Sequence, residues 1–135
     1  MDEINTLVVE DHQPQREALI EIFQRAGLKV GAAATLGEAI QALHVPTLKV
    51  VLLDLQLPDG SGMGILNRIR NHKLPLKVAV VTGSFEPSTQ EKLDWLMPDA
   101  VFRKPCSPAD LRQWVLEQMK AVNVTTTKPK APTKA

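Results

Sequence analysis

The stretch KVVLLDLQLPDGSGM, residues 49–63, carries the pattern on which the fold prediction rests. Its mostly apolar start, residues 49–53, predicts a strand that is buried on both faces, as the strands of a parallel sheet are. Asp54 follows this strand directly, and the Pro and Gly residues after it predict a loop before the next helix. The stretch therefore places a carboxylate at the carboxyl end of a buried parallel strand.

The same alternation of a short apolar run with a longer segment of helical period occurs five times along the chain. Such alternation is typical of βαβ units, which build an α/β fold with a parallel sheet covered by helices on both faces. We expect strands at residues 4–9, 28–33, 49–53, 77–81 and 100–102, and helices at residues 14–26, 36–43, 63–71, 87–96 and 108–121.

Several of the expected helices have recognisable ends. Pro14, Pro87 and Pro108 suit a first turn, because the N–H that proline lacks would have no partner within the helix there. Thr35 followed three residues later by Glu38 is the pattern of a capping box. Gly27 predicts the end of the first helix, since glycine readily adopts the left-handed conformation found after helix C-termini.

The length and composition indicate one folded domain. The chain has 135 residues, of which 44% are hydrophobic and 23% charged, and these values are typical of a globular protein rather than a disordered one. Residues 1–119 contain 12 Lys and Arg against 15 Asp and Glu, whereas residues 120–135 contain four Lys and no acid. The acidic body argues against direct nucleic acid binding, which requires a clustered basic surface.

Neither a membrane span nor a signal peptide is expected. No apolar run approaches the roughly 18 residues needed to cross a bilayer, and no basic segment followed by a hydrophobic stretch begins the chain. The single cysteine, Cys106, is able to form neither an internal disulfide nor a structural zinc site, which agrees with a reducing compartment. We therefore expect a cytoplasmic protein.

Polar side chains follow four of the five expected strands. Glu10 and Asp11 come after the first strand, Asp54 after the third, Thr82 after the fourth and Lys104 after the fifth. Right-handed crossovers bring the carboxyl ends of parallel strands to one edge of the sheet, which is also where ligands bind in such folds. We therefore expect these five side chains to share one shallow cleft.

Three carboxylates at this distance repel one another unless a cation lies between them. Mg²⁺ favours oxygen ligands of this kind, and it keeps coordination positions for water or phosphate. A carboxylate beside Mg²⁺ is able to attack phosphorus and form an acyl phosphate, while Lys and Thr side chains stabilise the oxygens of the transferred group. We predict that Asp54 is this nucleophile and that Lys104 and Thr82 assist it.

The motifs, in their order and spacing, resemble the receiver domain of two-component response regulators over residues 4 to about 121. The matching motifs are Glu10-Asp11, LLDLQLPDGSGM, Thr82-Gly83 and Lys104-Pro105. The resemblance implies a CheY-like, doubly wound (flavodoxin-like) parallel sheet of five strands in the order 2-1-3-4-5, with five helices. It assigns residues 1–122 to the receiver domain and residues 123–135 to a flexible tail rich in Lys, Thr and Pro or to the start of a linker.

The resemblance also implies a role for each site residue. Asp54 would accept a phosphoryl group from a sensor histidine kinase or a histidine phosphotransfer protein. Lys104 would pair with the phosphoryl group, and Thr82 would move toward it as the switch hydroxyl. The groups that would bind Mg²⁺ are the carboxylates of Glu10, Asp11 and Asp54 and the backbone carbonyl of Gln56.

A receiver of this kind signals by conformational change and catalyses only its own phosphorylation and slow dephosphorylation, so the resemblance does not imply an enzyme acting on external substrates. Its downstream protein target would bind the face formed by helix 4, strand 5 and helix 5. Alternatively, such a receiver would form a dimer when it is phosphorylated. Neither a membrane nor nucleic acid is expected to bind this domain directly.

The chain departs from the family pattern at Val101. Family members usually carry Tyr or Phe three residues before the lysine, whereas here the aromatic residue is Phe102, one position later. Successive side chains of a strand point to opposite faces, so Phe102 is expected to point away from the usual aromatic position and into the core. The sequence therefore leaves open whether the switch works with Val101 at that position.

Three other functions are consistent with parts of the pattern. The chain would be the receiver of a larger DNA-binding response regulator if an effector domain follows residue 135. A Mg²⁺-dependent phosphohydrolase with an aspartyl nucleophile typically has a second acid two residues after it, but here that residue is Gln56. A degenerate receiver would signal without phosphate, against which all five chemical positions are filled.

The remaining prominent residues are given structural roles. Asp59 lies between Pro58 and Gly60 and is interpreted as a turn residue. Trp95 and Trp114 lie on the last two expected helices, and both are expected to pack in the core or at its margin.

Overall fold

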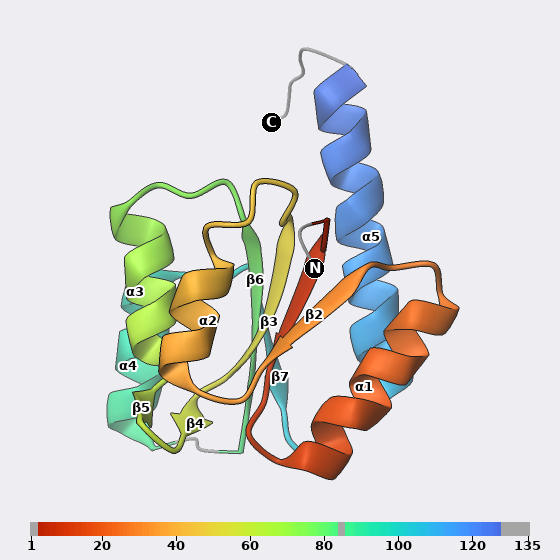
Figure 1. The fold of residues 1–135 in the computed structure, drawn as a ribbon. Helices are drawn as coiled ribbons and strands as arrows, with labels where there is room; N and C mark the ends of the chain where they lie inside the picture. The colour runs from red at the N-terminus through yellow and green to blue at the C-terminus, as the bar shows by residue number, and fades with distance from the viewer. Residues whose placement is uncertain (1–2, 84–85, 128–135) are drawn as a thin grey trace.

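A single parallel sheet forms the centre of the structure, a computed structural model that describes residues 3–83 and 86–127 (Figure 1). The strand order is β2-β1-β3-β6-β7. The predicted order 2-1-3-4-5 is confirmed, because two short strands, β4 and β5, lie outside this sheet and change only the numbering. The five strands are β1 (Thr6–Val9), β2 (Val30–Ala33), β3 (Val50–Asp54), β6 (Lys77–Thr82) and β7 (Ala100–Arg103).

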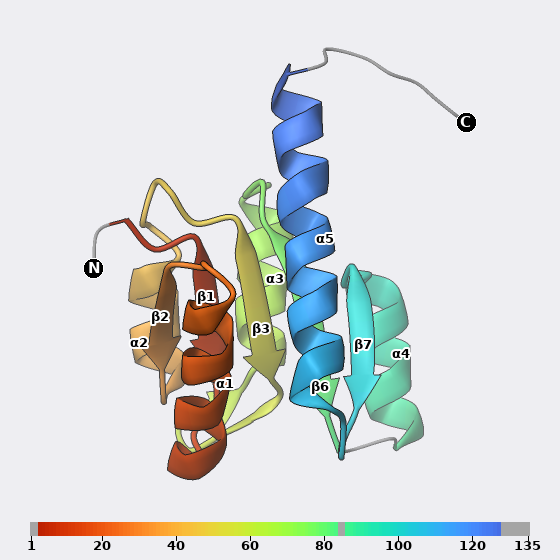
Figure 2. The same cartoon turned by 90° about the vertical axis from the view of Figure 1, so that its right-hand side faces the viewer.

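Helices cover both faces of the sheet. Figures 1 and 2 show α1 and α5 on one face and α2, α3 and α4 on the other. This arrangement confirms the predicted doubly wound α/β fold, with five helices in the part of the chain that is described. Their bounds are Gln13–Arg25 for α1, Leu36–Ala42 for α2, Met63–Asn71 for α3, Pro87–Leu96 for α4 and Pro108–Thr127 for α5.

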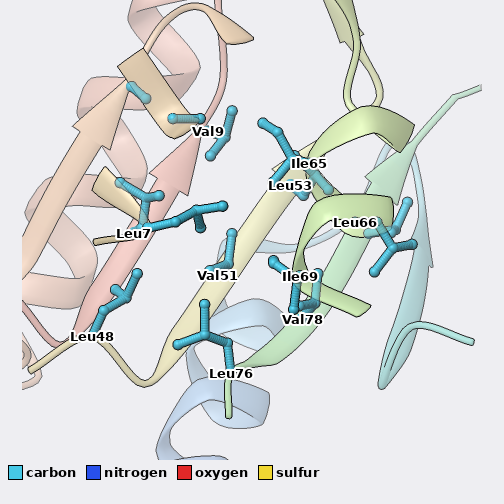
Figure 3. Packing of buried hydrophobic residues seen from close by; sticks show 14 of the residues in the cluster. Leu7, Val9, Leu48, Val51, Leu53, Ile65, Leu66, Ile69, Leu76 and Val78 are labelled. Atoms are coloured by element: carbon cyan, nitrogen blue, oxygen red, sulfur yellow. The ribbon is translucent and has the colours of Figure 1, made fainter. Parts of the chain in front are cut away.

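The unbroken apolar run of β3 is explained by two separate cores, one on each face of the sheet. Val51 and Leu53 pack in the core beneath α2, α3 and α4, whereas Val50 and Leu52 pack in the core beneath α1 and α5. Figure 3 shows the first of these cores, in which side chains of β1, β3 and α3 meet. Because β3 is buried on both sides, Asp54 at its carboxyl end is held in a fixed position at the edge of the sheet.

Helix α1 ends where glycine predicts that it should. Gly27 has a φ of +91°, its N–H donates to the carbonyl of Gln24 (3.0 Å), and the N–H of Leu28 donates to the carbonyl of Phe23 (3.1 Å). This pair of bonds satisfies carbonyls at the end of the helix and turns the chain toward β2. Phe23 in the last turn is fully buried against the sheet.

Two features were not predicted. Gln56–Leu57 and Gly60–Ser61 form a short antiparallel hairpin, β4 and β5, whose strands are too short to show an alternating pattern.

Helix α5 runs to Thr127 rather than to residue 121, since no Gly or Pro interrupts it before Pro129. It thus includes the first residues of the predicted tail, whose remainder, residues 128–135, lies outside the described residues.

Among the helices that the structure describes, none is both long and apolar enough to cross a bilayer. The longest, α5, carries charged residues between positions 110 and 120 and is amphipathic, with Leu111 and Val115 buried against the sheet. Figure 2 shows α5 projecting beyond the sheet at its C-terminal end.

Replacing Phe23 by alanine tests the core beneath α1 and α5. Phe23→Ala is expected to lower the free energy of unfolding by about 3–5 kcal/mol, because it leaves a cavity where a fully buried ring stood. Trp95→Ala is the control: its side chain is 84% exposed, so the change should stay within about 0.5 kcal/mol. Urea denaturation followed by circular dichroism measures both, and equal losses would contradict the assignment of Phe23 to the core.

Candidate functional site

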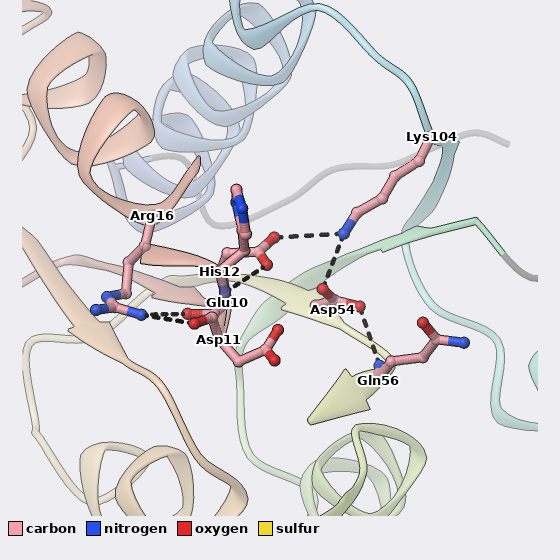
Figure 4. A network of polar contacts seen from close by, with 7 residues as sticks. All are labelled: Glu10, Asp11, His12, Arg16, Asp54, Gln56 and Lys104. Carbon is pink, nitrogen blue, oxygen red and sulfur yellow. Dashed lines mark hydrogen bonds and ion pairs between the residues drawn. The ribbon is translucent and has the colours of Figure 1, made fainter. Parts of the chain in front are cut away.

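The carboxyl ends of four strands meet at one edge of the sheet, as predicted. Glu10 follows β1, Asp54 is the last residue of β3, Thr82 is the last residue of β6, and Lys104 follows β7. Figure 4 shows Glu10, Asp54 and Lys104 directed toward one another from these different strands. Asp11 lies beside them and is exposed to solvent, whereas Glu10, Asp54 and Thr82 are buried.

Lys104 holds two of the carboxylates together. Its Nζ lies 2.9 Å from Asp54 Oδ2 and 3.4 Å from Glu10 Oε1. The two carboxylate side chains are only 7% and 8% exposed, so these ion pairs are shielded from solvent. Charges in such surroundings interact more strongly than exposed pairs, but each also loses hydration energy that the pairing must replace.

The pKa values of Glu10 and Lys104 reflect this arrangement. Burial raises the pKa of Glu10 above its ordinary value, and the nearby charge of Asp54 adds to the effect, while a hydrogen bond from the backbone N–H of His12 and the charge of Lys104 oppose it. Burial alone would lower the pKa of Lys104, but its hydrogen bond with Asp54 and the charges of Asp54 and Glu10 outweigh this, so its pKa is raised. Lys104 is therefore a stable cation at neutral pH.

Two backbone groups fix the carboxylates in place. The N–H of Gln56 donates to Asp54 Oδ1 (3.0 Å), and the N–H of His12 donates to Glu10 Oε2 (3.1 Å). Asp54 thus has Lys104 at one oxygen and the peptide of Gln56 at the other, as the dashed lines in Figure 4 show. Hydrogen bonds from both sides hold the side chain in one orientation.

The loop that carries the acid pair is held by Arg16, a residue that the sequence analysis did not single out. Arg16 Nη1 donates to the backbone carbonyl of Glu10 (3.0 Å) and to that of Asp11 (3.2 Å). The available signal was its place on the first turns of α1, directly after the acid pair. Arg16 binds backbone oxygens, which leaves both carboxylates directed into the cleft.

Three carboxylates lie close enough together to bind one metal ion. Glu10, Asp11 and Asp54 each offer an oxygen, and these oxygens lie within 4.8 Å of one another. Lys104 supplies one positive charge against three negative ones, and all three acidic groups are hard oxygen donors of the kind that divalent cations such as Mg²⁺ or Ca²⁺ prefer. The residues present therefore fit a divalent metal ion.

Thr82 and Lys104 are joined through the backbone. Thr82 is fully buried at the end of β6, and the N–H of Lys104 donates to its carbonyl oxygen (2.9 Å). This bond continues the pairing of β6 with β7 by one residue beyond the register pair Thr82 and Arg103. The ends of β6 and β7 are therefore connected by a backbone hydrogen bond at the site.

The two residues in the region of the family's aromatic position point in opposite directions. Val101 is 43% exposed, whereas Phe102 packs against Trp114 of α5 with ring centroids 6.4 Å apart in an edge-to-face arrangement. Phe102, which was expected to belong to the core, is partly buried and packs against the core beneath α1 and α5. The expectation that Trp114 packs in the core or at its margin is confirmed, but the same expectation for Trp95 is wrong: Trp95 lies near the end of α4 and is 84% exposed.

A family model described as the response regulator receiver domain matches residues 6–116. The phosphate regulon transcriptional regulatory protein PhoB of Escherichia coli is 28% identical over 107 residues, which are 78% of this chain and 47% of PhoB. The transcriptional regulatory protein PhoP of Escherichia coli is 34% identical over 99 residues, which are 72% of this chain and 43% of PhoP. The chain thus spans about half the length of these curated relatives.

Solved structures show the same fold. A CheY-like response regulator receiver domain protein from Methanospirillum hungatei superimposes with a TM-score of 0.80 at 25% identity, covering 87% of this chain and 94% of that one. The signal receiver domain of a putative LuxO repressor protein from Vibrio parahaemolyticus gives a TM-score of 0.82 at 22% identity, covering 93% and 96%. The second likeness bears on the fold alone.

Glu10→Gln tests the electrostatic state of the cluster. The raised pKa of Glu10 means that its ionised form costs folding free energy at pH 7, so the variant is expected to be more stable than wild type by about 1 kcal/mol in excess chelator. This gain should shrink as the pH falls toward and below 4.5, because the wild-type carboxyl then becomes protonated in both folded and unfolded chains.

Urea denaturation at several pH values measures this difference, and Glu91→Gln on the exposed surface of α4 is the control, with an expected change within about 0.5 kcal/mol. A Glu10→Gln variant that is less stable than wild type at pH 7 would show that the ion pair with Lys104 outweighs burial and repulsion.

Proposed function

Since this chain belongs to the family of response regulator receiver domains, which are signalling domains rather than classical enzymes, we propose that it accepts a phosphoryl group on Asp54 and signals by a change of conformation. The observation that carries this proposal is the environment of Asp54. A buried carboxylate at a strand end is hydrogen-bonded to Lys104 Nζ at 2.9 Å and lies in a cluster of acids able to bind a divalent metal.

Receiver domains interact with histidine kinases or phosphotransfer proteins, and a phosphohistidine of such a partner is the donor that we propose here. A carboxylate oxygen of Asp54 attacks phosphorus, a new O–P bond forms, and the N–P bond breaks with its electron pair returning to the imidazole. The product is an acyl phosphate on Asp54. Lys104, already in contact with Asp54, balances the charge on the transferred oxygens.

Receiver domains bind a divalent metal at this acidic pocket, and we propose that the ion is Mg²⁺. Its ligands would be the carboxylates of Glu10, Asp11 and Asp54 and the backbone carbonyl of Gln56. When bound, the ion would supply positive charge to the oxygens of the phosphoryl group. Arg16 and the N–H of His12 hold the acid pair in place for this role.

We propose that the signal leaves the site through Lys104 and Thr82. A phosphoryl group adds about 1.5 to 2 negative charges, which draw the Lys104 ammonium and attract the Thr82 hydroxyl. Because the N–H of Lys104 is bonded to the carbonyl of Thr82, a shift of either residue moves the ends of β6 and β7 together.

The proposed output surface is the face formed by α4, β7 and α5, which corresponds to helix 4, strand 5 and helix 5 of the predicted fold. Trp95, Met97 and Val101, on α4, directly after it and on β7, expose apolar side chains, with Trp95 84% and Met97 69% exposed. Large exposed apolar side chains of this kind favour binding to another protein. A downstream target or a second phosphorylated copy would bury them, and both would act in the cytoplasm.

The alternative is that this domain is the receiver of a larger DNA-binding response regulator. The relatives PhoB and PhoP are named transcriptional regulatory proteins, and this chain matches less than half of each. In that case the signal would pass to an effector domain of the same protein. The length of the natural reading frame distinguishes the two forms, since a helix-turn-helix domain after residue 135 would establish the alternative.

Intact mass spectrometry tests phosphorylation directly. Incubation with Mg²⁺ and a small acyl-phosphate donor is expected to add one phosphoryl group to wild type and none to Asp54→Asn, which has no carboxylate to attack phosphorus. A sample with excess chelator should also remain unmodified. Lys104→Ala should react at least about tenfold more slowly, because it lacks the cation that stabilises the transferred oxygens.

A beryllium fluoride mimic of the phosphoryl group provides the control for rapid hydrolysis. If wild type shows neither a mass adduct nor binding of this mimic in the presence of Mg²⁺, phosphoacceptance by Asp54 is refuted. An adduct that persists in Asp54→Asn would assign the acceptor to another residue.

A further inference from the structure

The N-terminus of α2 is completed by a residue that lies far away in sequence. The first four N–H groups of a helix have no partner within it. Thr35 satisfies one of them, since the N–H of Glu38 donates to its Oγ1 (3.1 Å), while the N–H of Ala39 makes the first bond of the helix itself, to the Thr35 carbonyl (3.1 Å). Asp59 satisfies two more: the N–H of Leu36 donates to its Oδ1 (2.7 Å) and the N–H of Gly37 to its Oδ2 (3.2 Å).

The carboxylate of Asp59 is well suited to this contact. The hydrogen bond from the N–H of Leu36 lowers the pKa of Asp59, with a further contribution from the N–H of Gly37, so the group is ionised at neutral pH. Negative charge is also stabilised at a helix N-terminus by the helix dipole. Since Asp59 is exposed to solvent, its place in the structure is explained by these two bonds and not by burial in the core.

Asp59 lies at the tip of the β4–β5 hairpin, and the base of this hairpin adjoins the proposed phosphoacceptor. Gln56 pairs with Ser61 and Leu57 with Gly60, so residues 58 and 59 form the turn. At the base, the N–H of Gly62 donates to the carbonyl of Leu55 (2.8 Å). The hairpin is therefore held to α2 at its tip, and its two arms are joined at the base, one residue after the end of β3.

The residue that links the hairpin to the chemistry is Gln56. Its N–H donates to Asp54 Oδ1 (3.0 Å), and in the proposed function its carbonyl faces the metal ion. Both groups belong to a short strand of two residues, whose position depends on what holds the rest of the hairpin. Close packing at the tip supports this: a Cβ added to Gly60 would lie 3.0 Å from Leu36 Cδ2.

We propose that Asp59 is a positioning residue for the phosphoacceptor site. By fastening the hairpin to the N-terminus of α2, it holds the peptide groups of Gln56 in the orientation that Asp54 and the metal ion require. Asp59 does not touch the reacting atoms and acts through Gln56. The inference rests on the proposed function, because the reaction that it assists is phosphoryl transfer to Asp54.

The variants Asp59→Ala and Asp59→Asn test this role, and Thr35→Ala is the matched control. Thr35→Ala removes a hydrogen bond from the same helix terminus but leaves the hairpin contact in place. Asp59→Asn keeps an acceptor oxygen for one of the two N–H groups and loses the charge. Thermal unfolding and circular dichroism confirm that all three variants are folded and show how far each is destabilised.

The first readout is amide hydrogen exchange by NMR on metal-free protein, which does not depend on phosphorylation. Asp59→Ala is expected to accelerate exchange of the Gln56 N–H about tenfold, since the hairpin then opens locally, and Asp59→Asn to a smaller extent. Thr35→Ala should leave this rate within about twofold of wild type. Unchanged exchange in Asp59→Ala, or equal acceleration in Thr35→Ala, would overturn the proposal.

The second readout is the phosphorylation rate at increasing Mg²⁺ concentration. Asp59→Ala is expected to raise the Mg²⁺ concentration for half-maximal rate about tenfold, as loss of a group that orients a metal ligand typically does, while Thr35→Ala leaves it unchanged. Wild type that is never phosphorylated and does not bind beryllium fluoride refutes the proposed function. Wild type and Asp59→Ala that respond identically to Mg²⁺ refute the positioning role alone.

Discussion

The structure of the site depends on one constraint, the repulsion among three carboxylates that the fold brings within 4.8 Å of one another. Lys104 relieves part of it by sharing its ammonium between Asp54 and Glu10. Burial makes this arrangement costly, as the raised pKa of Glu10 shows, and so the cluster favours a second cation. The same features that cost stability fit the site to bind a divalent metal. The cluster of like charges at this edge therefore lowers the stability of the fold and at the same time provides ligands for a metal ion.

The strand order explains why this cluster forms. Because β3 is central and is paired with β1 on one side and β6 on the other, the residues that follow these strands are neighbours in space although they are distant in sequence. The two cores hold β3 from both faces, so Asp54 has little freedom to move away from Glu10. Packing energy from the body of the domain therefore maintains an arrangement of like charges that would not form by itself.

The sequence predicts those parts of the structure that depend on local pattern. The apolar run before Asp54, the glycine after α1 and the polar residues at strand ends follow from periodicity and from the topology of parallel sheets, and all are found where expected. The contacts of Asp59 with α2 and of Arg16 with the acid pair were not predicted. A turn aspartate and a helix arginine have many partners within reach, and the sequence does not say which backbone groups lie beside them. The exposure of Trp95 escaped prediction for the same reason, since helical period alone does not fix how α4 is rotated against the sheet.

The departure at Val101 has a physical consequence for how a signal could leave the site. Strand geometry sends Phe102 to the face opposite Val101, where its ring packs against Trp114 and contributes to the core beneath α5. Turning that ring toward Asp54 would break this packing and would require the strand to shift by one residue, which would move every side chain of β7 to the other face. Phe102 is therefore unable to replace the aromatic residue usual in the family. The backbone bond between Lys104 and Thr82, by contrast, joins the ends of β6 and β7 whichever side chain occupies position 101.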